Sequence, residues 1–397
     1  MKFARLDLGG LGFDRGAHVL VKHALRGLEP GDVLHVLGTS PDLALHVRAW
    51  SRAQGHVLEP ASEGLGIRKG NAETGRWKGS ERAGQADPGR SGSILDRPPA
   101  RWGLAARGAR VESGGPDFRF ELDQKDVIWS EEVPRLYAQA AAAQWDPATA
   151  IAWSTGFTLP DEVEDAVVQV MTYLIENEVA ALILPARYAA QVHPHFREVM
   201  QLLAIQAADE ARHVEVFTRR ALLKRPDLGL STAGGQASLK TLVDEPDFAL
   251  AMFLLSVMGE GSFLSLLWFL RDNAPDPVTR QVATLSAQDE ARHVAFGLAH
   301  LSRHLEHDPG LRSRLAEAVE TRHEALRQTS GLNEEVFDAL VVLAAGEWNP
   351  EAIARGHEKV LALVRDMSEG RQRRLERLGF SADDASRLSG LHTRNFM

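Results

Sequence analysis

The hexapeptide DEARHV occurs twice in this 397-residue chain, at Asp209–Val214 and at Asp289–Val294. In each copy a glutamate precedes a histidine by three positions. Residues so spaced lie on one face of a helix, one turn apart, so a carboxylate oxygen and an imidazole nitrogen can bind the same metal ion. The predicted ligand pairs are Glu210 with His213 and Glu290 with His293.

Each pair follows a segment that carries a further glutamate among apolar residues. In the second half this residue is Glu260, within the apolar segment Ala249–Leu270. In the first half Glu176 and Glu178 compete, and because they are about 200° apart around a helix, only one of them can face inward. Glu178 has the more apolar neighbours and aligns with Glu260, so we favour Glu178 and keep Glu176 as the alternative.

Together these side chains favour a dinuclear metal site. One glutamate from each of two helices and one Glu-x-x-His pair from each of two others form the arrangement that builds carboxylate-bridged metal centres. The charges of four carboxylates and two divalent ions cancel, whereas without metal some of the crowded carboxylates would take up protons. Two iron ions are expected, and manganese is the alternative that the same ligands accept.

The helices that position these residues follow from the apolar spacing. From about residue 126 the chain is predicted to be helical to its end. Two consecutive helix pairs, 161–191 with 195–224 and 246–273 with 276–307, each carry one copy of the motif. The fold class is therefore predicted as mainly α, with a helical bundle over 126–310 and a helical extension over 311–397. The other predicted helices are 126–144, 311–328, 333–346, 350–377 and 381–389.

The N-terminal part of the chain has a different pattern. Residues 1–60 alternate between strand-like and helix-like spacing and predict a small α/β domain. Residues 61–116 contain 12 of the 34 glycines. We therefore interpret the segment 61–125 as a connector with little regular structure. Its local excess of basic residues indicates that it wraps over the acidic body of the same protein.

Composition and charge exclude several classes of protein. The formal net charge of -9 argues against nucleic acid as a partner. The absence of cysteine excludes disulfides, thiolate nucleophiles and Cys-ligated clusters. The first residues lack the apolar core of a signal peptide, so a cytoplasmic location is expected. The segment 249–270 is long enough to cross a bilayer, but Glu260 at its centre favours a buried helix over a membrane span.

Residues 126–307 resemble the ferritin-like di-iron carboxylate superfamily, most closely its ribonucleotide-reductase-like branch. That branch includes bacterial multicomponent monooxygenases and acyl-carrier desaturases. The resemblance implies a ferritin-like four-helix bundle in which Glu210 and Glu290 bridge two irons. It also implies that Glu178 and Glu260 are terminal ligands and that His213 and His293 each bind one iron.

The residues that precede the ligand glutamates also match the family pattern. Asp209 and Asp289 occupy the position of an acidic residue that accepts a hydrogen bond from a ligand histidine of the opposite half. Phe217 departs from the pattern, because radical-storing reductase subunits carry a tyrosine four residues after the first ligand histidine. A stable tyrosyl radical is therefore not expected.

The first 60 residues resemble the sulfur-carrier family of TusA. The similarity covers Leu6-Asp7-x-x-Gly10-Leu11, Ala24-Leu25-Arg26 and Pro30-Gly31-Asp32. Phe13-Asp14 replaces the active Cys-Pro of that family, so persulfide transfer is excluded. The resemblance implies a domain that serves as a docking or lid module.

These observations predict an O2-activating non-haem di-iron oxidoreductase that acts on a small organic substrate. Electrons must come from an external donor, because the chain has no glycine motif for nucleotide binding and no cysteine-ligated centre. A homodimer is expected. Hydroxylation, desaturation and amine oxidation are not distinguished. The alternatives are a ferroxidase or peroxide-scavenging protein, and a structural module that recruits a partner through residues 1–60.

Overall fold

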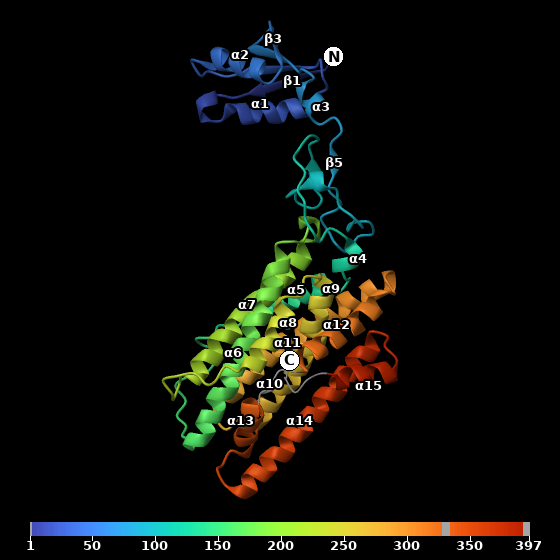
Figure 1. Cartoon of the computed structure of the whole chain (residues 1–397). Coiled ribbons are helices and arrows are strands. Elements are labelled where there is room, and N and C mark those ends of the chain that lie inside the picture. The colour runs from blue at the N-terminus through green and yellow to red at the C-terminus, as the bar shows by residue number, and fades with distance from the viewer. Residues whose placement is uncertain (1, 328–333, 392–397) are drawn as a thin grey trace. The chain divides into compact units, whose positions relative to one another are not determined.

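The computed structural model describes residues 2–327 and 334–391. The chain forms two compact units, Met1–Ala83 with Gly108–Asp117 and Gly84–Arg107 with Phe118–Met397. Most of the regular structure is helical, so the predicted mainly-α fold class is confirmed (Figure 1). Each unit has its own hydrophobic core.

The first unit is an α/β domain, as predicted, around a four-stranded sheet of order β1-β2-β4-β3. The strands β1 and β2 are parallel, whereas β4 is antiparallel to both β2 and β3. Leu34 and Ile67 are paired across the sheet and are fully buried in one core with Val21 and Val47 of two helices. The elements are β1 (Phe3–Asp7), η1 (Phe13–Arg15), α1 (Ala17–Arg26), β2 (Val33–Leu37), α2 (Leu43–Ala53), β3 (Val57–Glu59) and β4 (Leu65–Arg68).

The sheet continues past residue 60, into the segment predicted as a connector. β4 was not predicted because it is short and contains Gly66, so it lacks the alternation of a half-buried strand. Its approach to β2 needs a glycine at position 64, where φ is +67° and a Cβ would lie 2.3 Å from the Val36 carbonyl oxygen. A helix and a two-stranded antiparallel sheet complete the unit, namely α3 (Ala72–Arg76), β5 (Glu81–Arg82) and β6 (Arg110–Val111).

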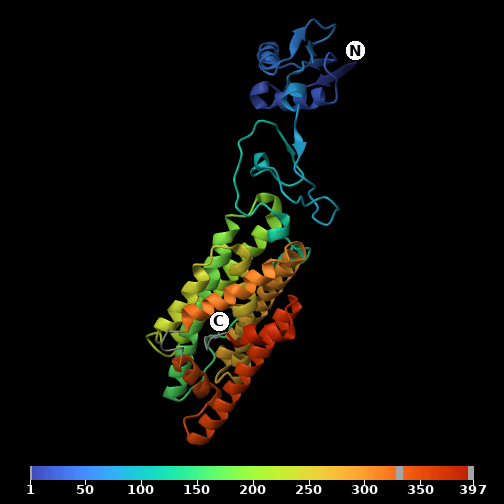
Figure 2. The same ribbon diagram turned by 45° about the vertical axis from the view of Figure 1, so that its right-hand side comes forward.

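The second unit is built around long helices that lie side by side (Figures 1 and 2). α6 (Asp161–Ala189) packs along α7 (Arg197–Ala221). A composite helix packs along α11 (Pro277–His307) and consists of α9 (Phe248–Met252), the π-helix η4 (Phe253–Glu260) and α10 (Gly261–Asn273). The two predicted helix pairs are therefore both present, although the π-helix was not predicted.

Two further helical segments differ from the prediction. The predicted helix 126–144 is divided into α4 (Lys125–Ile128) and α5 (Val133–Ala142). Trp129 between them is extended, with φ -90° and ψ 146°, and Pro134 in the first turn of α5 lacks the N–H that would continue a helix. α8 (Ala233–Val243) was missed because its first turn contains two glycines. The Thr232 hydroxyl caps it by accepting a hydrogen bond from Gly235 N at 3.0 Å.

The C-terminal extension is helical, as predicted. The helices of the extension are α12 (Leu311–Leu326), α13 (Glu334–Ala345), α14 (Pro350–Arg377) and α15 (Ala382–Gly390). α13 packs on α6 and α14, and α14 packs on α10. Short 3-10 turns occur at η2 (Ala100–Trp102) and η3 (Pro194–Phe196).

Part of the basic connector packs on this helical unit. Arg107 is buried and donates hydrogen bonds to both carboxylate oxygens of Glu198 on α7, at 2.7 and 2.5 Å. The same guanidinium donates to the His195 carbonyl at 2.8 Å. These contacts tie residues 84–107 to the acidic bundle, in the way the charge distribution predicted.

Two of the helices have the length and composition of membrane spans, Asp161–Ala189 and Phe248–Asn273. Their most apolar windows are 67% and 83% buried inside the protein. Such burial is typical of core helices, which avoid water by packing against one another.

Candidate metal centre

Four helices bring the six predicted ligand residues into one buried cluster. The side chains form two overlapping groups, and within each group the potential ligand atoms all lie within 4.8 Å of one another. Glu210 and Glu290 belong to both groups. The first group adds Glu178 and His213, and the second adds Glu260 and His293.

The histidines face the shared glutamates from two sides. His213 Nδ1 lies 3.1 Å from Glu210 Oε2 and 3.2 Å from Glu290 Oε1. His293 Nδ1 lies 3.1 Å from Glu210 Oε1 and 3.2 Å from Glu290 Oε2. The two oxygens of each shared glutamate therefore point toward different histidines, which is the geometry that a bridging carboxylate requires.

Glu178 and Glu176 occupy different environments. Glu178 is buried, and its Oε1 lies 3.5 Å from His213 Nδ1. Glu176 is half-buried and belongs to neither ligand group. The helix face that carries Glu178 therefore faces the cluster. His300, two turns after His293, also lies outside the cluster, with Nε2 2.6 Å from the Val127 carbonyl oxygen.

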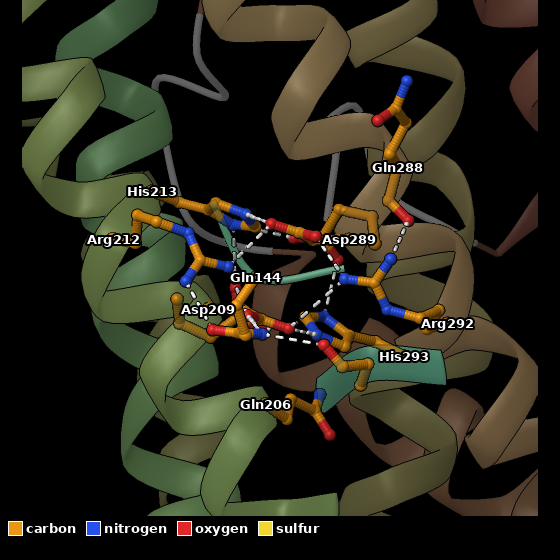
Figure 3. Close-up of polar contacts among 12 residues, drawn as sticks. Gln144, Gln206, Asp209, Arg212, His213, Gln288, Asp289, Arg292 and His293 are labelled. Atoms are coloured by element: carbon orange, nitrogen blue, oxygen red, sulfur yellow. Dashed lines mark hydrogen bonds and ion pairs between the residues drawn. The ribbon is translucent and has the colours of Figure 1, made fainter. Parts of the chain in front are cut away.

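The aspartates that precede the ligand glutamates contact the histidines of the opposite half. Asp289 Oδ2 lies 3.2 Å from His213 Nε2, and Asp209 Oδ2 lies 3.3 Å from His293 Nε2 (Figure 3). An Nε2–H that donates to the aspartate leaves the Nδ1 lone pair directed at the glutamates. Such contacts orient a ligand histidine and select its tautomer.

Two arginines join the aspartates into one layer beside the cluster. Arg212 donates to Asp209 and, at 3.0 Å, to Asp289 Oδ2. Arg292 donates to Asp289, and its Nη2 lies 3.7 Å from Asp209 Oδ2 (Figure 3). Burial alone would raise the pKa of both aspartates, but their hydrogen bonds and attraction to the histidines, with the arginine contacts of Asp289, lower it. Both aspartates are therefore ionised acceptors.

Two residues just after α5 complete this layer. Gln144 Nε2 donates to Asp209 Oδ1 at 2.9 Å, and Trp145 Nε1 donates to Asp289 Oδ2 at 2.8 Å. The Arg212 guanidinium lies 4.6 Å from the centroid of the Trp145 ring. The sequence analysis missed both residues, because nothing in their local spacing distinguishes them from other polar and aromatic residues.

Several carboxylate oxygens at the centre accept no hydrogen bond of good geometry from the described part of the chain. They are Glu178 Oε1, Glu210 Oε1 and Glu260 Oε2. The other oxygen of Glu260 accepts a hydrogen bond from Nε2 of Gln206 at 2.9 Å, and Gln206 lies one turn before Glu210 on α7. Buried carboxylate oxygens without donors are costly unless a cation binds them. The residues present therefore fit a pair of metal ions.

The charges of the cluster interact strongly. Burial raises the pKa of Glu178 and Glu260 well above 4.5, and neighbouring glutamates raise it further. Burial opposes the charge on His213 and His293, but the surrounding carboxylates raise their pKa well above 6.5. In the metal-free protein, protons therefore occupy the atoms that metal ions would use, so metal binding must release protons.

The π-helix ends at Glu260. Its hydrogen bonds run from i to i+5 and occur rarely, often at functional sites. α11 approaches this helix closely at Gly297, where a Cβ would lie 2.4 Å from Ser256 Cβ. A larger residue at position 297 would push apart the two helices that supply Glu260 and the second Glu-x-x-His pair.

Phe217 lies at the position where a radical-storing tyrosine was considered. It is fully buried, and its ring centroid is 6.2 Å from that of His213. The side chain has no hydroxyl, so it cannot store a phenoxyl radical beside the cluster.

Comparison with known proteins supports the fold. An R2-like ligand-binding oxidase variant with an aerobically reconstituted Mn/Fe cofactor is similar with a TM-score of 0.50 and 19% identity, covering 64% of this chain and 96% of the other. A second variant of such an oxidase, also with a Mn/Fe cofactor, has a TM-score of 0.49, 20% identity, and coverage of 64% and 98%. A third, with an Fe/Fe cofactor, has a TM-score of 0.48, 19% identity, and coverage of 64% and 95%.

No protein-family model matches the chain, and no curated protein matches it. At this identity, the likeness shows a similarity of fold.

Proposed function

We propose that this protein is an O2-activating non-haem dimetal oxidase or oxygenase that acts on a small organic substrate. The observation that carries the proposal is the pair of overlapping ligand groups that share Glu210 and Glu290. Two groups with two common carboxylates suit two ions bridged by those carboxylates. We further propose a ferritin-like four-helix bundle formed by α6, α7, α11 and the composite helix.

In this proposal each residue has a defined task. Glu210 and Glu290 would bridge the ions, while Glu178 and Glu260 would each bind one ion from the end. His213 and His293 would bind through Nδ1, since Nε2 faces an aspartate. A bound pair of redox-active ions would supply electrons to O2 and oxidising power for the substrate. Iron is the first candidate, and the Mn/Fe cofactor of a similar structure adds manganese as a second.

The protein's own contribution is to orient the ligand histidines and to exclude water from the site. The aspartate–arginine layer fixes the two imidazoles, and its members are themselves fixed by Gln144 and Trp145. Apolar side chains such as Phe217 and Phe263 are fully buried around the cluster and keep it dry. Exclusion of water strengthens the electrostatic interactions of the site and suppresses side reactions.

The remaining expectations belong to the proposal too. We propose a cytoplasmic homodimer with an external electron donor and no nucleic-acid or membrane partner. The α/β unit would be a TusA-like domain without carrier chemistry, because Phe13 stands in η1 at the position of the active cysteine. Such a unit would serve in docking.

The test combines metal analysis with turnover. The chain is loaded anaerobically with Fe(II), or with Mn(II) and Fe(II), and we expect about two metal ions per chain with the magnetic signature of a coupled pair. Oxygen consumption is then measured with a panel of small organic substrates. We expect O2 to oxidise at least one of them, with or without incorporation of an oxygen atom into the product. A mononuclear signal would refute the dimetal site. Rapid Fe(II) oxidation to ferric mineral, unaffected by every substrate, would identify a ferroxidase instead.

A further inference from the structure

A second candidate site lies between α10, α11 and α14, on the side of the composite helix next to Glu260. It is a cavity of about 290 Å³. One part of its wall is basic and another is apolar. The basic part consists of Arg373, Arg374 and Arg377, and the apolar part of Leu264, Trp268 and Leu298.

Two of the three arginines that line this cavity, Arg374 and Arg377, form no ion pair with a carboxylate of the described residues. Arg374 donates to two neutral groups, the Val257 carbonyl at 2.7 Å and the Ser262 hydroxyl at 3.3 Å. Arg371, which is only 7% exposed, donates to the same hydroxyl at 3.1 Å, and its Nε has no partner. In residues 2–327 and 334–391, no carboxylate forms an ion pair with Arg371, Arg374 or Arg377, whereas Arg373 lies 3.6 Å from Glu369.

Two other buried arginines, Arg107 and Arg220, have carboxylate partners. Arg107 contacts Glu198, and Arg220 contacts both Glu164 and Asp276. A buried guanidinium without an anion is costly, since it has lost its water and gained no opposite charge. Burial lowers the pKa of Arg371 to about 10, and burial with the neighbouring Arg371 and Arg373 lowers the pKa of Arg374 to about 9. The guanidinium groups here are therefore placed to gain from a bound anion.

We propose that this cavity binds a small organic anion whose carboxylate or phosphate contacts Arg374 and Arg377. Planar guanidinium groups bind both head groups through paired hydrogen bonds. The apolar body of the ligand would contact Leu264, Trp268 and Leu298, because a carbon skeleton gains from leaving water there. An inorganic ion alone would leave this apolar wall uncovered.

The position of the cavity couples it to the helix that carries Glu260. Gly261 lines the cavity, and a Cβ at this position would lie 2.3 Å from Arg374 Nε. The close approach of the guanidinium thus needs a glycine next to Glu260. An anion that binds Arg374 would compete with the Val257 carbonyl of the π-helix for the same guanidinium. The proposal does not depend on metal binding, so it stands or fails separately from the oxidase activity.

Binding is tested with the full chain, by calorimetry, in metal-free and metal-loaded protein. The probes are benzoate, phenyl phosphate and, as the neutral control, benzyl alcohol. We expect saturable binding of at least one anion at one site per chain, and at least tenfold weaker binding of the alcohol. The tighter of the two anions identifies the head group.

Variants locate the site. Arg374→Gln and Arg377→Gln should each weaken anion binding about tenfold, the effect of losing one charged hydrogen bond. Arg365→Gln, an exposed position on the same helix outside the cavity, should leave affinity within twofold. Arg377 is exposed, so its variant should fold even if the Arg374 variant does not. Absence of saturable binding, equal binding of the alcohol, or an equal loss in the Arg365 variant would overturn the proposal.

Discussion

Replacing Glu178 by glutamine should stabilise the metal-free protein while weakening metal binding. Glutamine has the shape of the protonated acid and carries no charge. Burial and the neighbouring glutamates raise the pKa of Glu178 well above 4.5 in the folded chain, whereas in the unfolded chain the side chain ionises normally. Above pH 4.5 the folded state must therefore retain a proton or bear a disfavoured charge, and the glutamine variant escapes both.

The direction and size of the change in the free energy of unfolding follow from proton linkage. A group with a raised folded pKa contributes stability that is present below its unfolded pKa and is lost as pH rises toward the folded pKa. Each pH unit over which Glu178 stays protonated corresponds to about 1.4 kcal/mol. Between pH 5 and pH 7 the variant should therefore become progressively more stable than the natural chain. Its Tm should rise relative to that of the natural chain over this range, by roughly 2–4 °C for each kcal/mol gained.

Metal should offset this gain. A ligand that binds only the folded state stabilises it in proportion to the logarithm of its affinity, so a 100-fold loss of Mn(II) affinity removes about 2.7 kcal/mol. The assay is thermal unfolding of both chains from pH 5 to pH 8, with chelator and with Mn(II). Glu176→Gln is the matched control, since this half-buried residue lies outside the cluster. If Glu178→Gln destabilised the metal-free protein at every pH, or if Glu176→Gln reproduced its effects, the assignment of the helix face would be wrong.

Three further outcomes are expected. Asp289→Asn should lower metal affinity about 10- to 100-fold, because it removes the charged acceptor that orients His213, and should also lower the Tm of the metal-free chain, because Arg212 and Arg292 lose a buried charged partner; metal titration measures the first effect, and unchanged affinity would contradict the role. A chain beginning at Gly84 should keep its helical circular dichroism and bind metal, since the two units have separate cores; loss of the metal site would show that they are not separable. The reduced, loaded protein exposed to O2 should show no long-lived tyrosyl signal in electron paramagnetic resonance, because Phe217 occupies that position; a persistent tyrosyl radical in high yield would refute this.

Much of the ligand set was predictable from local spacing. A helix repeats its faces every three to four residues, so Glu210 and His213 had to share a face wherever the helix packed. The choice of Glu178 over Glu176 rested on the same reasoning, because a carboxylate among apolar neighbours must be buried with them. The ends of the long helices were also predictable, since proline and capping residues act on their own turn; Asp276 accepts hydrogen bonds from Val278 and Thr279 as a helix cap.

Elements whose stability depends on distant partners were not predictable. β4 carries no alternation of its own and exists because it pairs with strands on both sides. The π-helix is defined by hydrogen bonds from residue i to residue i+5, and the apolar spacing of the sequence does not distinguish this pattern from that of an α-helix. The first turn of α8 contains two glycines, which weaken a helix by themselves.

The residues around the ligands show most clearly which features are determined by local sequence and which by tertiary structure. The sequence by itself determined which six side chains could bind metal, because residue type and helical period are local properties. Only the tertiary structure decided that Gln144 contacts Asp209, 65 residues away, and that Trp145 contacts Asp289, 144 residues away. It likewise brought Arg374 to a helix more than 100 residues earlier, beside Val257. Such contacts depend on how helices pack after the chain has folded, and no spacing within a single helix records them.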